Sequence, residues 1–88
     1  YVRLVFARSG LACRQGLAPA NKVGVIDSDY RGEWLIYLYN QASEPRVINP
    51  GDRVAQLVLL PVLTPTVVEA DSLDETDRGA GGFGSTGQ

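Results

Sequence analysis

Short apolar segments separated by turn-forming residues dominate this sequence. Segments such as YVRLVFA (1–7) and RVAQLVLL (53–60) are bounded by Gly, Pro, Asp or Asn nearby in the chain. No helical period in the apolar residues persists over the roughly 11 residues needed to identify an amphipathic helix. The pattern therefore predicts an all-β domain, a small sandwich or barrel built from brief strands. Alternation in the first segment places Val2, Leu4 and Phe6 on one face and Tyr1, Arg3 and Val5 on the other.

The strongest strand prediction is EWLIYLYNQ (33–41). Its nearly continuous aromatic and branched residues are typical of a strand buried on both faces, within a sandwich or at a subunit interface. ARSGLACRQG (7–16) is expected to form a polar turn or a short helical turn, and LAPANK (17–22) a loop. The full set of expected strands is 1–7, 22–27, 33–41, 46–49, 53–60 and 64–70.

Charge and apolar content limit the kinds of partner. The chain has 88 residues and a formal net charge of −2, and its isoelectric point is near 4.9, which argues against a binder of nucleic-acid polymers. The longest apolar run, LVLLPVL (57–63), is far shorter than the roughly 18 residues of a membrane span. We therefore expect neither a nucleic-acid polymer nor a membrane as partner, and local arginines would have to hold any anionic ligand.

The numbers of cysteine and histidine residues indicate where the protein resides and which reactions its side chains can support. The single Cys13 cannot form an internal disulfide, which favours a reducing cytoplasm. The absence of histidine disfavours imidazole metal sites and His-dependent triads. The remaining carboxylate, hydroxyl, amide and guanidinium groups suit phosphoryl or nucleotidyl hydrolysis, with Mg2+ neutralising the phosphates. Because the chain starts at Tyr1 and contains no methionine, we expect it to be the C-terminal part of a longer chain.

The C-terminal segment RGAGGFGSTGQ (78–88) is rich in glycine. Its glycines have the G-x-G-x-x-G spacing of dinucleotide-binding loops, and residues 79–86 nearly match a P-loop, with Ser85 where lysine is required. Both motifs need a strand before the loop, whereas an acidic connector (71–77) precedes this one, so both are rejected. The composition predicts a flexible arm attached to a β domain over residues 1–77.

Arg78 and Phe83 support a second interpretation of this arm. An arginine is a fork-shaped phosphate ligand, and Phe83 is the only large aromatic side chain in its segment. The two side chains could hold the phosphate and the base of a nucleotide. The arm would then become ordered only when that nucleotide binds.

Three other segments place polar groups at turns or in an apolar strand. Arg8 and Ser9 follow the first strand, either as a solvated turn or as an anion site. Asp27 and Tyr30 lie at a bend that is either an ordinary hairpin turn or a site where a carboxylate orients water beside a sugar. Gln56 lies in an otherwise apolar strand and needs a partner from the protein, water or a ligand.

In order along the chain, four segments resemble motifs of the trimeric dUTP diphosphatase (dUTPase) family. They are ARSGLA, ANKVGVIDSDYRGE, PGDRVAQL and RGAGGFGSTG, the second to fifth of the family's five motifs. The resemblance implies a dUTPase-like distorted jelly-roll or β-barrel, here N-terminally incomplete, and a homotrimer whose active sites are shared between subunits. The first motif is expected upstream of Tyr1, and Ala7 stands where the family often has Pro or Gly.

The resemblance also implies roles for individual residues. Asp27 would activate the water that attacks the α-phosphorus of dUTP, Tyr30 would stack on deoxyribose, and Asn21 with the hairpin backbone would read uracil. Mg2+ would be held by the substrate phosphates and water, without a protein metal cage. The residues implied to contact the substrate are Arg8, Ser9, Gly10, Asn21, Gly24, Val25, Ile26, Tyr30, Gln56, Arg78, Phe83, Gly84, Ser85 and Thr86.

The expected activity is hydrolysis of dUTP to dUMP and pyrophosphate, which keeps uracil out of DNA and supplies dUMP for thymidylate synthesis. Two alternatives stay open. One is a catalytically impaired nucleotide- or partner-binding module on the same fold, motivated by the missing first motif. The other is a relative of dCTP deaminase, which shares the fold, although the glycine arm and the SDYRG segment favour the diphosphatase.

Overall fold

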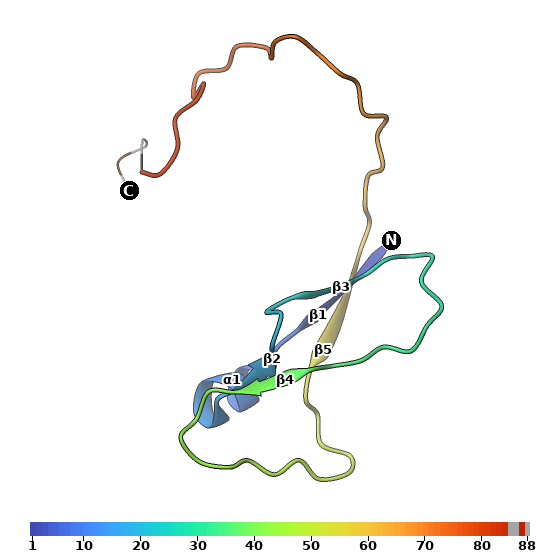
Figure 1. The fold of residues 1–88 in the computed structure, drawn as a ribbon, viewed down its shortest axis with the longest axis vertical. Coiled ribbons are helices and arrows are strands. Elements are labelled where there is room, and N and C mark those ends of the chain that lie inside the picture. The colour runs from blue at the N-terminus through green and yellow to red at the C-terminus, as the bar shows by residue number, and fades with distance from the viewer. Residues whose placement is uncertain (85–86, 88) are drawn as a thin grey trace.

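Five strands and one helix make up the regular structure of residues 1–84 and 87, the part of the chain that the computed structural model describes (Figure 1). All strand pairs are antiparallel, so the predicted all-β class is confirmed. The elements are β1 (Val2–Phe6), α1 (Ser9–Gln15), β2 (Leu17–Pro19), β3 (Gly24–Ile26), β4 (Leu38–Asn40) and β5 (Gln56–Leu60).

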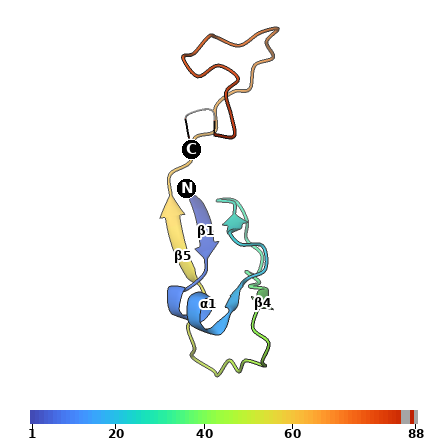
Figure 2. The ribbon, with the colours of Figure 1, turned by 90° about the vertical axis from the view of Figure 1, so that its left-hand side faces the viewer.

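β1 is the central strand of the larger sheet. That sheet has the order β3-β1-β5, and Val5 lies opposite Gly24 of β3 and Leu57 of β5. β2 and β4 form a separate two-stranded sheet, in which Pro19 lies opposite Leu38. Figure 2 shows α1 at the end of β1, where it connects the two sheets.

The helix α1 follows β1 closely and ends at Gly16. Arg8 is still extended, with φ −97° and ψ 132°, whereas Gly16 has a left-handed φ of 73°. The Gly16 N–H donates to the Ala12 carbonyl at 3.1 Å, which satisfies one of the last helical acceptors. The helical turn predicted within residues 7–16 is therefore confirmed. Nowhere in the described part of the chain does a helix reach the length and apolar content of a membrane span.

The strand predicted over residues 33–41 is wrong for most of its length. Only Leu38–Asn40 form a strand, β4. Its partner β2 is short and ends at Pro19. One further bond joins the Ala20 N–H to the Tyr37 carbonyl at 2.8 Å, and the chain then turns, with the Lys22 N–H donating to the Pro19 carbonyl. The apolar residues before β4 are exposed instead of buried on both faces, as at Tyr37, which is 72% exposed.

Four smaller predictions also differ from the structure. Residues 46–49 and 64–70 form no strand, and the strand predicted at 53–60 begins only at Gln56. Prolines lie beside or within both missing strands and cannot donate ladder hydrogen bonds. Conversely, Leu17–Pro19 was predicted as loop and forms β2, because pairing with β4 satisfies its backbone.

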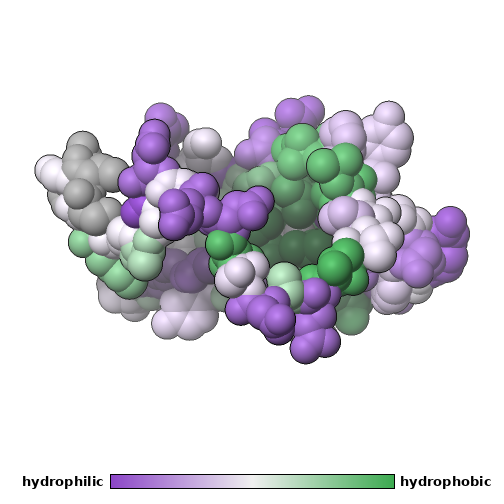
Figure 3. Space-filling view, turned by 90° about the horizontal axis from the view of Figure 1, so that it is seen from above, coloured by the Kyte–Doolittle hydropathy of each residue, from purple (hydrophilic) through white to green (hydrophobic). Residues whose placement is uncertain are grey.

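Little apolar surface is buried within one copy of the chain. Val5 and Leu17 are the buried hydrophobic side chains among the described residues, each 6% exposed. The radius of gyration is 19.0 Å, against about 12 Å for a compact domain of this length, because the segment after β5 runs away from the sheets (Figures 1 and 2). On one face, apolar residues surround a hollow (Figure 3). An exposed apolar surface of this kind is typical of a protein–protein contact.

Replacing Gly16 with alanine tests the turn that ends α1. Alanine would hold a strained left-handed φ, and its Cβ would lie 3.0 Å from the Ala42 backbone nitrogen. Gly51 is the matched control, because its φ is 88° but a Cβ there meets nothing within 4 Å. We expect Gly16→Ala to lower the free energy of unfolding by about 2 kcal/mol and Gly51→Ala by about 1 kcal/mol. Urea denaturation of the full-length protein measures both, and equal losses would contradict a steric role for Ala42.

Candidate active site

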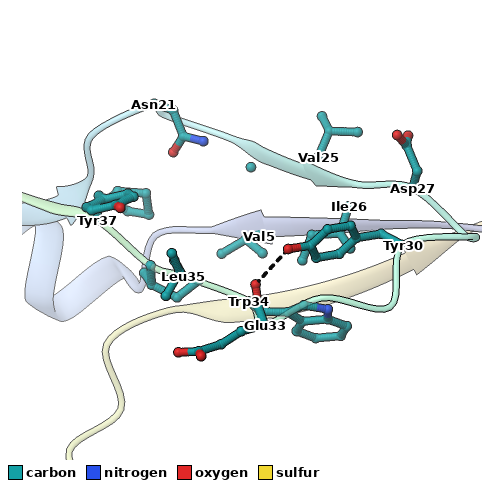
Figure 4. A pocket seen from close by; sticks show the side chains of 13 residues that line it. Val5, Asn21, Val25, Ile26, Asp27, Tyr30, Glu33, Trp34, Leu35 and Tyr37 are labelled. Atoms are coloured by element: carbon teal, nitrogen blue, oxygen red, sulfur yellow. Dashed lines mark hydrogen bonds between the residues drawn. The ribbon is translucent and has the colours of Figure 1, made fainter.

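A pocket of about 310 Å³ lies between residues 21–30 and the segment that precedes β4 (Figure 4). Residues 21–30 comprise a turn, β3 and a bend, and are called the hairpin below. Val5 of β1 lies at its back in this view. The walls combine apolar surface with a few polar groups, as in sites for small molecules. The lining residues are Val5, Pro19, Asn21, Gly24, Val25, Ile26, Asp27, Tyr30, Glu33, Trp34, Leu35, Ile36 and Tyr37.

A tight turn brings β3 back along β1. Lys22 has a left-handed φ of 70°, and its N–H donates to the Pro19 carbonyl at 3.1 Å. The turn leaves the Asn21 amide beside Gly24, since a Cβ on Gly24 would lie 3.6 Å from Asn21 Nδ2 and 3.3 Å from Val5 Cβ. Glycine at this position therefore lets the hairpin approach Val5 closely and keeps its backbone open to the pocket.

β3 is an edge strand of its sheet. In the described part of the chain, β1 pairs with one side of β3, and the backbone groups on the other side can hydrogen-bond a ligand. The residues of β3 line the pocket together with the Asn21 amide. This combination of backbone donors and acceptors with a side-chain amide suits a planar polar ring.

The bend after β3 holds Asp27 and Tyr30 at one end of the pocket. The Tyr30 N–H donates to the Asp27 carbonyl at 3.1 Å, and the Tyr30 hydroxyl donates to the Glu33 carbonyl at 3.1 Å (Figure 4). Gly32 leaves room for the ring, because a Cβ there would overlap the Tyr30 hydroxyl and Cζ. The Asp27 carboxylate is exposed, so that a ligand or water can reach it.

The structure thus brings together one group of the residues that the sequence predicted as a site. Their roles stay predictions, but their proximity is a property of the fold. The members of this group are Asn21, Gly24, Val25, Ile26, Asp27 and Tyr30.

A second predicted group lies outside this pocket, where β1 leads into α1. Arg8, Ser9 and Gly10 occupy the junction and the first turn of α1. Gln56 reaches the same junction from β5, because its Nε2 donates to the Ala7 carbonyl at 2.7 Å. The partner expected for this polar side chain is thus provided by the protein for its N–H group, and its amide oxygen can accept a further bond.

The C-terminal arm forms a third group, which does not line the pocket either. Arg78 Nε donates to the Gly81 carbonyl at 2.6 Å, Phe83 is fully exposed, and Gly84 has a left-handed φ of 84°. Ser85 and Thr86 lie outside the described residues. Within one copy of the chain, residues 78–84 of the arm are therefore separate from the pocket.

Sequence reasoning missed the wall of the pocket that residues 33–37 form. That segment was interpreted as a core strand, and its apolar character on both faces was the available signal. Arg3 was also missed, although a charged residue inside an apolar strand is a signal of the same kind. Its Nη2 donates to the Asp27 carbonyl and to the Tyr30 carbonyl, and its guanidinium covers Trp34.

Comparison with known proteins places the chain in a family. The family model described as dUTPase matches residues 1–87. A deoxyuridine 5'-triphosphate nucleotidohydrolase of Desulfitobacterium hafniense (strain DSM 10664 / DCB-2) is 66% identical over 83 residues, which cover 94% of this chain and 55% of that protein. The protein of the same name from Coxiella burnetii (strain Dugway 5J108-111) is 49% identical over 84 residues, 96% of this chain and 55% of its own length.

A third relative is the deoxyuridine 5'-triphosphate nucleotidohydrolase of Idiomarina loihiensis. It is 46% identical over 88 residues, which cover 100% of this chain and 58% of the relative. The chain thus spans little more than half the length of these curated relatives. The match of the family model over nearly every residue shows that the chain belongs to the dUTPase family.

Proposed function

We propose that the protein hydrolyses dUTP to dUMP and pyrophosphate. The observation that carries this proposal is the pocket, which gathers the Asn21 amide, the edge of β3, Asp27 and Tyr30 in a chain of the dUTPase family. Its volume of about 310 Å³ lies at the lower end of the range for small-molecule sites. The relatives named as deoxyuridine 5'-triphosphate nucleotidohydrolases support the same substrate.

The uracil ring would bind along the edge of β3. Backbone N–H and carbonyl groups of Gly24–Ile26 and the Asn21 amide would pair with its polar edge, and a cytosine would leave some of these groups without a partner. Because the backbone groups of β3 belong to a paired strand, they cannot rotate to suit another base. Thymine would be excluded by the bulk of its extra methyl group.

Tyr30 would stack on the deoxyribose. Its hydroxyl bond to the Glu33 carbonyl and the space above Gly32 hold the ring in one place. A ring held in this way leaves no room for a 2′-hydroxyl, which would discriminate against ribonucleotides. Selectivity for base and sugar would thus come from one hairpin.

Asp27 would act as the general base. Its carboxylate would take a proton from a water molecule while the water oxygen bonds to the α-phosphorus. The bond from the α-phosphorus to the bridging oxygen breaks, and pyrophosphate leaves with the electron pair of that bond. The position of Asp27 at the rim of the pocket fits this role, because the phosphates of a bound nucleotide would emerge there.

The phosphates would be held by groups from other copies of the chain, in a homotrimer. Arg8, Ser9, Gly10 and Gln56 would contact them from one neighbour, and the arm would supply Arg78 and the predicted ligands Ser85 and Thr86 from another. Phe83 and Gly84 of the arm would cover the base. Two observations support this arrangement: the members of this set that the structure describes lie outside the pocket of their own chain, and the chain leaves large apolar side chains exposed.

Mg2+ would enter with the substrate. Among residues 1–84 and 87, no three or more His, Cys, Asp or Glu side chains gather where they could hold a metal ion. We expect the ion to be coordinated by the triphosphate and water. When bound, it would neutralise phosphate charge and polarise the phosphoryl oxygens, while Arg8 and Arg78 would supply the protein's positive charge.

Asp27→Asn tests the assigned base. We expect kcat for dUTP to fall about 1,000-fold, because an amide cannot accept the proton, while nucleotide binding stays nearly unchanged. Asp29→Asn is the matched control, since Asp29 is exposed and does not line the pocket. Pyrophosphate release and calorimetric dUTP binding are measured on the same samples. Near-normal turnover by Asp27→Asn would reject the role of Asp27 as the base. In the unaltered protein, saturable dUTP binding without pyrophosphate release would favour a binding module, and ammonia release from dCTP would favour a deaminase.

Gly32→Ala tests the placement of the Tyr30 ring. The added Cβ would overlap the ring, so the ring must move away from the sugar. We expect dUMP affinity to fall about tenfold, the size of a lost aromatic contact, with little change in the unfolding midpoint. Gly51→Ala is the control, because a Cβ there meets nothing within 4 Å and Gly51 does not line the pocket. Unchanged dUMP affinity in isothermal calorimetry would contradict the proposed stacking.

Complementation between two inactive variants tests the shared site. We expect removal of residues 78–88 to lower kcat about 100-fold, because the arm aligns the triphosphate. Co-expression with differently tagged Asp27→Asn chains should restore part of the activity in mixed trimers, since some sites then combine an intact Asp27 with an intact arm. Mixed trimers no more active than either parent would place Asp27 and the arm of each site in the same chain.

A further inference from the structure

We propose that Arg3 is a positioning residue that braces the bend carrying Asp27 and Tyr30. The inference deepens the proposed function and rests on it, because it assigns to Arg3 the placement of the proposed base and of the ring proposed to stack on the sugar. Arg3 does not line the pocket, and we assign it no direct contact with the substrate.

Arg3 joins three parts of the molecule. It lies on the central strand β1, opposite Ile26 of β3. Its Nη2 donates to the carbonyl of Asp27 and, at 3.4 Å, to the carbonyl of Tyr30. Its guanidinium carbon lies 4.9 Å from the centre of the Trp34 ring, which lines the pocket. A single planar group therefore links the central strand, both ends of the bend and the wall of the pocket.

The bend has a local brace of a different kind. Arg31 Nη1 donates to the Ser28 carbonyl at 2.7 Å and to the Tyr30 carbonyl at 3.2 Å. These bonds stabilise the shape of the bend, but they join residues next to one another in the chain. Arg3 is 24 residues from Asp27, so its bonds tie the bend to the sheet. Placement matters here, because an error of about 1 Å in a reacting group can lower the rate about 100-fold.

The chemistry of the contact requires arginine. A guanidinium presents several N–H donors in one plane and stacks with that plane on an aromatic ring. Lysine carries the same charge on a single ammonium group without a planar face. Arg3→Lys therefore keeps the charge and most of the side-chain length while it removes the simultaneous bonding and stacking.

The test uses Arg3→Lys in the full-length protein, with Arg14→Lys of the exposed end of α1 as the matched control. We expect kcat for dUTP to fall about tenfold with an unchanged thermal midpoint. The Tyr30 amide should exchange its hydrogen about tenfold faster, since the bend opens more often. The emission of Trp34, isolated as the difference from a Trp34→Phe variant, should shift to longer wavelength. The control should match the unaltered protein in every measurement.

Unchanged kcat and unchanged Tyr30 exchange in Arg3→Lys would overturn the proposal. A fall in thermal midpoint with unchanged Tyr30 exchange would also overturn it, because Arg3 would then stabilise the fold without holding the bend. If the unaltered protein releases no pyrophosphate from dUTP, the proposed function fails, and hydrogen exchange with Trp34 emission still decides whether Arg3 braces the bend. Should Arg3→Lys not fold, Arg3→Gln retains one amide donor and is held to the same exchange criterion.

Discussion

The antiparallel pairing of β1 with β3 is the interaction on which the pocket depends. It places Gly24 against Val5, one of the few buried side chains, and a larger residue than glycine would crowd Val5. From that contact, the backbone of β3 extends along one wall of the pocket and leads to Asp27. β1 also carries Arg3, whose bonds reach the bend beyond β3. β1 therefore determines both the back of the pocket and the position of its proposed base.

In the proposed function, recognition of the nucleoside is separate from binding of the phosphates. Base and sugar would meet groups from one hairpin, whose donors and acceptors are held by strand pairing and a tight turn. The predicted phosphate ligands lie at the junction of β1 and α1 and on the arm, away from that hairpin. In the proposed trimer, subunit contact would bring these groups together, so that assembly and completion of the site are one event. The sparse core of a single copy fits this view, because much of its apolar surface is still open.

The residue inventory is consistent with this division. The sequence contains no histidine, and in the proposed mechanism proton transfer would fall to a carboxylate and charge stabilisation to arginine and a metal ion brought by the substrate. Rigid groups suit the discrimination of similar bases, because a wrong base leaves buried polar groups without partners. Groups that arrive from neighbouring chains suit the phosphates, which present the same charge in every nucleotide. In this proposal, the contacts that select the base therefore come from β3, which is held by its pairing with β1.

The sequence by itself determined what depends on local chemistry. Alternation in residues 1–7 predicted β1, and the polar segment 7–16 predicted a turn or a short helical turn. The resemblance of the motifs to the dUTPase family selected Asn21, Asp27 and Tyr30. Only the tertiary structure decided the fate of residues 33–41, because apolar composition cannot distinguish a strand buried in a core from the wall of a pocket, and the partner strand needed for a longer ladder ends at Pro19. The proposed role of Arg3 could not be predicted either, since alternation assigns it a face of the strand but not the bend, 24 residues away, that it contacts.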